Sequence, residues 1–159
     1  MKCISTVSYQ FLVNGAPSRS IKPTRKLRQG DPLSPFLFIL CQNILSLMLV
    51  RAESQGDLQG VKVSRGSPPI NHLLFADDSY VFFRINVHSC RKMKKVLNDF
   101  CKLSGLRISL AKSELFTSQN CKLQRKRWYC GILGVKYVSE PSKYLGIEFG
   151  RMNRKKEFF

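Results

Sequence analysis

The apolar positions along the chain predict two long helices. Apolar residues fill most of the segment from Pro35 to Val50, which predicts a helix over residues 34–53. Because this helix is apolar on nearly all sides, we expect it to be buried. A second helix is predicted over 86–104, with Gly105 suited to end it. Its buried stripe is expected to comprise Met93, Val96, Leu97, Phe100 and Leu103.

Shorter apolar segments rich in β-branched and aromatic residues predict strands. We expect strands near residues 5–13, 19–23, 61–63, 70–84, 113–117, 135–138 and 143–149, and a short helix near 120–130. Asn14 and Gly15 are typical of the tight turn after the first strand. The pattern predicts an α+β fold in which helices pack on one face of an antiparallel sheet.

Two neighbouring carboxylates interrupt one of these apolar segments. The sequence Phe75-Ala76-Asp77-Asp78 lies between Leu73-Leu74 and a run that begins at Tyr80, which predicts a strand, a tight turn and a strand. A hairpin tip would hold both aspartates at the edge of a sheet. Hard cations such as Mg²⁺ take oxygen ligands, and paired carboxylates suit phosphoryl transfer. The simpler alternative is a plain surface turn, because Asp is a common turn residue.

A basic loop with a glycine precedes the first long helix. The sequence from Arg28 to Pro35 reads RQGDPLSP, and Gly30 allows a left-handed turn or a close backbone approach. Ser34 can cap the helix with Pro35 at its first position, or Asp31 can cap it one turn earlier. Helix N-termini favour anions. An ordinary, well-capped junction between loop and helix is the alternative.

Together these two sequences carry a resemblance to a known family. The RQGDPLSP stretch followed by HLLFADDS resembles motifs B and C of the reverse transcriptase domain of LINE-type, non-LTR retrotransposons, especially those of plants. Supporting similarity comes from the segment at Ser104–Ile108 with Lys112, which resembles motif D, and from the KYLG sequence at 143–146. The resemblance implies a polymerase palm over residues 1–150, with a basic tail at 151–159.

The resemblance also implies roles for particular residues. Asp77 and Asp78 would be the catalytic ligands of Mg²⁺ or Mn²⁺, and Lys112 would act near the leaving pyrophosphate, unless it is only a surface lysine. RNA template, DNA primer and a deoxynucleotide would be the partners. The expected nucleotide- and template-binding residues are Arg28, Gln29, Gly30, Phe75 and Ala76, although Phe75 could simply pack in the sheet.

The family pattern includes one motif that this sequence lacks. Polymerase palms place a third Asp on a strand upstream of motif B, and the residues before Arg28 contain no Asp or Glu. Two-metal chemistry needs ligands that hold both ions roughly 3.5–4 Å apart. We therefore expect a partial palm that is catalytically inactive when alone.

The charge of the chain favours nucleic acid as a partner. The 159 residues include 27 basic and 10 acidic ones, for a formal net charge of +17, and the excess is concentrated after residue 84. Such a balance favours binding to phosphates, although a basic surface can also be merely solvated. Trp128 follows the basic run Arg125-Lys126-Arg127 and could stack bases, but we expect it to lie in the core.

The remaining features indicate an intracellular chain. The six cysteines form no CxxC pair, and neither histidine completes a zinc-binding spacing. We expect His72 to be packed, His88 to be exposed and the thiols to be reduced, in the nucleus or cytoplasm by family resemblance. Pro35, Gln42 and Asn43 interrupt the long apolar segment, so we expect a buried helix rather than a membrane span.

Three functions remain open at this point. The first is a part of an RNA-directed DNA polymerase. The second is a basic module that binds nucleic acid without chemistry. The third is a non-functional retroelement relic that does not fold stably, because an exposed sheet edge and apolar surface favour aggregation.

Overall fold

The computed structural model describes residues 7–22, 30–118 and 120–139. The chain divides into two compact units, Met1–Cys41 and Gln42–Phe159, and each is described by itself. The predicted strand and KYLG motif at residues 143–149 and the basic tail at 151–159 lie outside the described residues, as do Arg28 and Gln29.

The first unit contains a small hairpin and the start of a long helix. Strands β1 (Leu12–Val13) and β2 (Ala16–Pro17) pair antiparallel around the predicted turn. Asn14 and Gly15 both have positive φ, 51° and 81°, which is the geometry that Asn-Gly favours in two-residue hairpin turns.

The long helix α2 spans Ser34–Ser54. Just before the helix, the Oδ1 of Asp31 accepts a hydrogen bond of 2.8 Å from the backbone N–H of Leu33, which is the side-chain contact of an Asx turn. Pro32 follows Asp31 in the chain, where its missing N–H leaves no intrahelical bond unmade.

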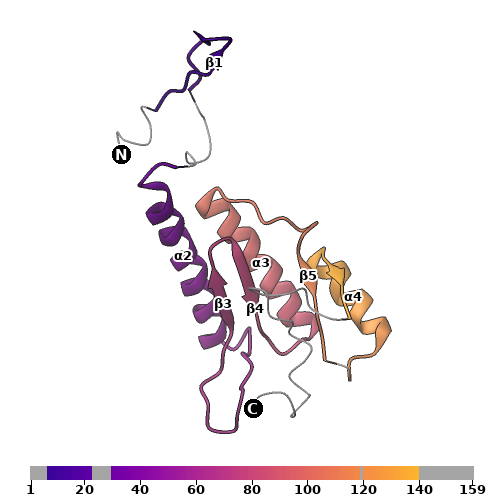
Figure 1. Cartoon of the computed structure of the whole chain (residues 1–159). Helices are drawn as coiled ribbons and strands as arrows, with labels where there is room; N and C mark the ends of the chain where they lie inside the picture. The colour runs from indigo at the N-terminus through magenta and orange to yellow at the C-terminus, as the bar shows by residue number, and fades with distance from the viewer. Residues whose placement is uncertain (1–6, 23–29, 119, 140–159) are drawn as a thin grey trace, which may run out of the picture. The chain divides into compact units, whose positions relative to one another are not determined.

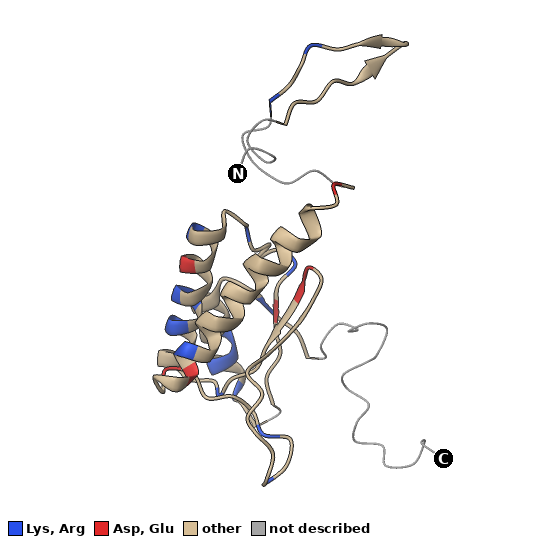
Figure 2. Cartoon of the chain, turned by 90° about the vertical axis from the view of Figure 1, so that its left-hand side faces the viewer, with Lys and Arg blue, Asp and Glu red and all other residues tan. Residues whose placement is uncertain are grey.

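The second unit is built on an antiparallel hairpin with helices on one face. Strands β3 (His72–Phe75) and β4 (Asp78–Val81) pair with each other, and α3 spans Val87–Ser104. The hairpin lies between the labelled part of α2 and α3 in Figure 1, and the turned view of Figure 2 shows both helices on the same side of it. The predicted α+β class and the helices on one sheet face are confirmed.

One buried cluster joins the helices to the hairpin. Its buried members come from α2, from the loop after it and from α3, and Leu74 and Val81 of the hairpin pack against them. The buried residues are Leu45, Leu49, Ala52, Leu58, Met93 and Phe100.

A second cluster surrounds helix α4 (Leu123–Leu133), with Cys90, Leu115 and Tyr129 at its centre. Strands β5 (Glu114–Leu115) and β6 (Lys136–Tyr137) flank this helix in sequence and pair parallel. The described strands therefore form three separate two-stranded sheets instead of one antiparallel sheet. A helix joins β5 to β6, and such a crossover connection is what parallel neighbours require.

Three burial expectations are wrong for particular residues. Helix α2 is buried only along Leu45, Leu49 and Ala52, because the described core contacts one face of it. Leu103 is 70% exposed, since it lies in the last turn of α3, and Cys90 is fully buried on that helix. Trp128 is 57% exposed, because α4 instead turns the neighbouring Tyr129 into the core.

Helix α2 is also long and apolar enough to cross a membrane, judged by length and composition alone. Its buried residues belong to the same hydrophobic cluster as Met93 and Phe100. The structure thus uses one stripe of this helix for packing within the second unit.

Candidate functional site

The two carboxylates lie at the closed end of the β3–β4 hairpin. Phe75 pairs with Asp78 across the ladder, so Ala76 and Asp77 form a two-residue turn. This confirms the predicted strand, turn and strand. Figure 2 shows acidic positions at this closed end. Ala76 has a φ of 47°, a conformation that residues other than Gly, Asn and Asp rarely adopt.

The register of the hairpin divides its side chains between two faces. Leu74 and Val81 pack against the helices, and successive strand residues point to opposite faces. Phe75 and its partner Asp78 therefore belong to the opposite face, where Leu73 is 40% and Phe75 is 52% exposed. The site consequently presents an aromatic ring and a carboxylate together on the face that the helices leave open.

One side chain of helix α2 forms a hydrogen bond with the turn. The Nε2 of Gln42 donates a hydrogen bond of 3.2 Å to the carbonyl oxygen of Ala76. The Oε1 of Gln42 is buried and has no hydrogen-bond partner among the described residues. This contact fixes the strained turn against a helix. Sequence analysis missed it, although a glutamine inside an otherwise apolar helix was the signal that could have revealed it.

A chain of polar side chains fixes β3 against the same helix. The Nδ2 of Asn71 donates to the Oε2 of Glu53 at 2.6 Å, and the Oδ1 of Asn71 contacts the Nδ1 of His72. The Nε2 of His72 lies 2.8 Å from the Oγ of Ser46. Because Asn71 uses its amide N–H toward Glu53, its oxygen accepts from His72, which places the imidazole proton on Nδ1. Ser46 then donates to Nε2.

Burial supports the same protonation state. Desolvation lowers the pKa of His72 below its ordinary value, and the smaller effect of the Glu53 charge raises it. His72 is therefore packed, as expected from the sequence, and the lowered pKa favours its neutral form. Asn71 is 8% exposed, so its two side-chain contacts replace water.

The carboxylates themselves are exposed, and no ion pair to Asp77 or Asp78 occurs in the part of the chain that the structure describes. Their oxygens are the donor type that Mg²⁺ and Mn²⁺ prefer. Over residues 7–22, 30–118 and 120–139, no three His, Cys, Asp or Glu side chains come together as a metal-binding group. The hairpin thus brings two carboxylates together at its closed end.

Gly30 of the basic loop has a φ of 83°, so the predicted left-handed turn is present there. A Cβ at this position would meet no heavy atom within 4 Å, which leaves the backbone accessible. Gly30 belongs to the first unit and the hairpin to the second. Each is therefore a separate candidate contact for a nucleotide.

Lys112 lies in an exposed turn between α3 and β5, where its backbone N–H donates to the carbonyl of Ser109 at 3.0 Å. In Figures 1 and 2 the segment between α3 and β5 starts at the same end of the second unit as the closed end of the hairpin. The side chain of Lys112 is exposed, and its role near the pyrophosphate stays a prediction.

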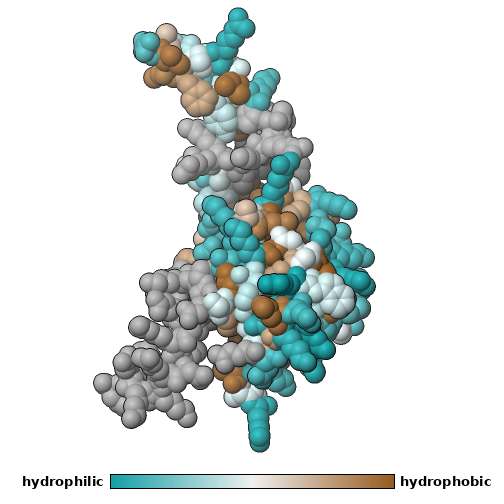
Figure 3. Space-filling model, turned by 90° about the vertical axis from the view of Figure 1, so that its right-hand side faces the viewer, coloured by the Kyte–Doolittle hydropathy of each residue, from teal (hydrophilic) through white to brown (hydrophobic). Residues whose placement is uncertain are grey.

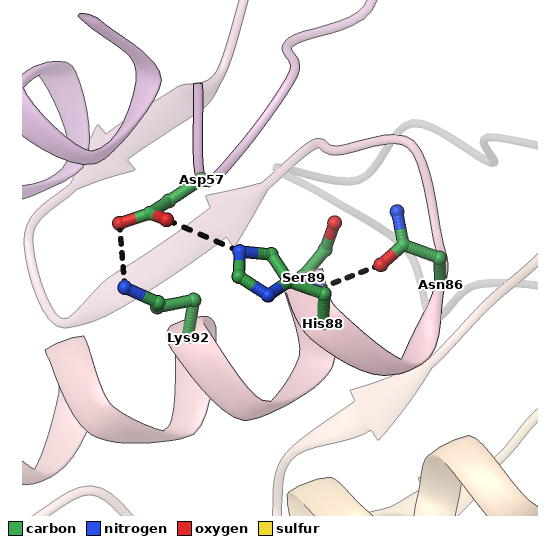
Figure 4. A network of polar contacts seen from close by, with 5 residues as sticks. All are labelled: Asp57, Asn86, His88, Ser89 and Lys92. Carbon is green, nitrogen blue, oxygen red and sulfur yellow. Dashed lines mark hydrogen bonds and ion pairs between the residues drawn. The ribbon is translucent and has the colours of Figure 1, made fainter. Parts of the chain in front are cut away.

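At the opposite end of α3, an ion-pair network was also missed by sequence analysis. Asp57 accepts from Lys92 at 3.0 Å and contacts the Nε2 of His88 at 3.1 Å, as Figure 4 shows. The hydrogen bonds from Lys92 and then His88 lower the pKa of Asp57 below its usual value. Asn86 caps the helix by accepting from the N–H of Ser89 at 2.8 Å. This network ties the loop after α2 to α3.

Comparison with known proteins gives a consistent result. A family model described as reverse transcriptase (RNA-dependent DNA polymerase) matches residues 1–149. An uncharacterised mitochondrial protein of Arabidopsis thaliana is 61% identical over 69 residues, which cover 43% of this chain and 57% of that protein. A retrovirus-related Pol polyprotein from a type-2 retrotransposable element of Drosophila melanogaster is 32% identical over 151 residues, 89% of this chain and 13% of the polyprotein.

Proposed function

Since this chain belongs to the reverse transcriptase family, as a segment of the kind found in non-LTR retroelements, we propose that its hairpin supplies two metal ligands for RNA-directed DNA synthesis. The chain spans 57% of the first relative and 13% of the second, so the activity of a whole polymerase is part of this proposal. The observation that supports it most is the adjacent pair Asp77 and Asp78, exposed at the tip of a hairpin and held by Gln42.

In this proposal Asp77 and Asp78 bind Mg²⁺ or Mn²⁺. When bound, such ions lower the pKa of an attacking hydroxyl and stabilise the charge on a departing pyrophosphate. The described residues bring two acids together instead of three, so a further carboxylate must complete the centre. We infer that the described residues alone bind a divalent ion weakly and do not extend a primer.

The other expected residues have supporting roles in the proposal. Phe75 lies on the open face beside Asp78 and would contact the primer end, while the carbonyl of Ala76 is already held by Gln42. Gly30 with Arg28 and Gln29 would contact nucleotide and template, and Lys112 would act near the pyrophosphate. The partners are RNA template, DNA primer and a deoxynucleotide, in the nucleus or cytoplasm.

Paramagnetic Mn²⁺ tests the metal role directly. We expect Mn²⁺ to broaden the amide resonances of the β3–β4 turn in the wild-type chain, and Asp77→Asn or Asp78→Asn to weaken this effect at least tenfold. Asp99→Asn removes the same charge from α3, outside the β3–β4 turn, and should leave the broadening unchanged. Broadening that persists equally in Asp77→Asn would disprove the metal site.

A second candidate function is nucleic-acid binding without chemistry. It is favoured by the strongly basic composition together with the incomplete acid group. Both candidates predict RNA binding without primer extension by this chain alone, so metal binding separates them. Mn²⁺ broadening at the β3–β4 turn that depends on Asp77 supports polymerase chemistry, whereas salt-sensitive RNA binding without this broadening, unchanged in Asp77→Asn, supports the binding module. A chain that shows no cooperative thermal unfolding would instead support the relic.

A further inference from the structure

We propose that the exposed face of α4 binds single-stranded nucleic acid, with Trp128 as a stacking platform for a base. This face comprises the exposed residues Leu123, Gln124, Arg125, Arg127, Trp128 and Gly131. The inference does not depend on the hairpin carboxylates. It follows from the placement of Trp128 outside the core.

The packing of α4 leaves this face uncovered by the described residues. Tyr129 is 7% exposed, and Ile132 and Leu133 pack beside it, so one side of the helix is fixed in the core. Trp128 directly precedes Tyr129, so it is turned away from it by about 100° around the helix axis. Trp128 is 57% exposed. An exposed indole needs no rearrangement before a base stacks on it, and such stacking contributes about 1–3 kcal/mol per base.

The charge beside the indole suits a phosphate backbone. Arg125 lies three residues before Trp128, and residues at this spacing are neighbours on a helix surface. Arg127 is also exposed, and the helix contains no acidic residue. Lys126 is different: its Nζ donates to the hydroxyl of Tyr137 at 2.7 Å and lies 4.7 Å from that ring's centre. Lys126 therefore stabilises the contact with β6, while the two arginines stay available.

The helix surface one turn after the indole carries no side chain. Gly131 lies three residues after Trp128, and a Cβ built on it would meet no heavy atom within 4 Å. Gly131 thus leaves the surface beside the ring open. Figure 3 looks onto the side of the second unit that carries α4, and hydrophilic side chains dominate that side around smaller pale and brown patches.

The location of this face separates it from the hairpin. Helix α4 packs on α3 and on β6, and in Figure 1 it lies on the far side of α3 from β3 and β4. A strand bound to α4 would therefore contact the protein at a second position. A single strand fits better than a duplex, because only unpaired bases offer their faces for stacking.

Trp128 is the one tryptophan in the sequence, so its fluorescence reports on this site alone. We expect a single-stranded oligouridylate to quench it in a saturable, salt-sensitive manner. In a parallel anisotropy assay with labelled oligouridylate, Trp128→Ala should weaken binding roughly 5- to 100-fold, and Trp128→Phe should restore part of the affinity. Arg125→Ala should weaken binding and reduce its salt dependence.

Two controls make the result specific. Lys62→Ala removes one exposed positive charge from the segment between α2 and β3. This variant should change the affinity less than Arg125→Ala does. Asp77→Asn should leave the quenching unchanged or slightly stronger. A negative result for the metal site can therefore be distinguished from a negative result for the α4 site. The proposal is overturned if oligouridylate does not quench, if Trp128→Ala binds as tightly as wild type, or if polyglutamate quenches equally well, which would indicate an acidic polypeptide partner.

Discussion

At the scale of single residues, the turn of the hairpin contains backbone strain. Ala76 has a φ of 47°, and a left-handed conformation costs a residue with a Cβ about 1–2 kcal/mol relative to glycine. The neighbouring bond from Gln42 to the Ala76 carbonyl helps to hold this conformation. The strain lies directly beside the two carboxylates, which is where strained residues in functional sites are often found.

Replacing this alanine should therefore stabilise the protein. Ala76→Gly relieves the positive φ but increases the entropy of the unfolded chain, so we expect a net gain of up to about 1 kcal/mol in the free energy of unfolding. Urea denaturation measures it. Ala111→Gly is the matched control, because Ala111 is exposed in a turn without positive φ and should lose stability. Equal losses in both variants would contradict the strain.

The buried thiol of Cys90 gives a second prediction at this scale. Burial, and to a lesser degree the charge of Cys130, raises the pKa of Cys90 from 9.0 to about 11. Two pKa units reduce the reactive thiolate about 100-fold, so iodoacetamide at pH 8 should modify the partly exposed Cys121 well before Cys90. Mass spectrometry of peptides measures both rates.

The same shift has a defined effect on stability. Because the native pKa of Cys90 is raised, the unfolded thiol ionises first, and its contribution to the stability of the native state declines as pH rises from 9 toward 11.

Denaturation before labelling is the control for the iodoacetamide experiment, and it should make Cys90 and Cys121 equally reactive. If Cys90 reacts as fast as Cys121 in the native chain, the burial described here is wrong.

At the scale of elements, polar contacts specify how the hairpin sits on α2. Ser46, Glu53, Asn71 and His72 connect the helix to β3, and apolar packing of Leu74 reinforces them. Hydrophobic burial has no direction, whereas hydrogen bonds fix one register. The element pair thus owes its position to a few polar side chains.

The protonation of His72 should make this pair sensitive to acid. Its native pKa lies below the ordinary value of 6.5, so the unfolded chain takes up the proton first as pH falls. The free energy of unfolding should decrease below about pH 6.5 and level off once pH passes below the native pKa. Urea midpoints from pH 7.5 to 5 measure this slope. His72→Gln keeps a polar side chain and should flatten the slope, and a slope equal to wild type would contradict the assignment.

Sequence reasoning located the elements well but not their burial. The long helices, the Asn14-Gly15 turn and the carboxylate hairpin follow from local patterns that the fold preserves. The partial exposure of α2 and the exposure of Trp128 do not, because they depend on which segments pack nearby. The Gln42 contact with Ala76 joins residues 34 positions apart in sequence, a separation that no local pattern reports.

At the scale of the whole molecule, the second unit is basic and has an apolar stripe on its surface. Ile44, Leu47 and Val50 of α2 are 39%, 69% and 49% exposed, on the sides of the helix that the described core leaves open. Contiguous apolar surface of this kind favours association. A protein with this surface should remain soluble mainly through its net charge of +17.

A pair of neighbouring leucines tests this description. Leu47 is 69% exposed and Leu49 is fully buried. Leu49→Ala should lower the free energy of unfolding by about 2–5 kcal/mol. Leu47→Gln should change it by less than about 0.5 kcal/mol and reduce concentration-dependent light scattering at high salt. A large destabilisation by Leu47→Gln would show that this stripe is buried in solution.

The register of the β3–β4 hairpin has a consequence for how its sequence can vary. Asn71 is anchored by Glu53, and the turn begins five residues later at Ala76. Because side chains alternate between faces, one residue inserted or deleted between these points would turn the side chains that now pack on the helices to the open face. It would also turn those on the carboxylate face toward the helices. The hairpin should therefore accept substitutions at Leu73 more readily than any change in the length of this segment.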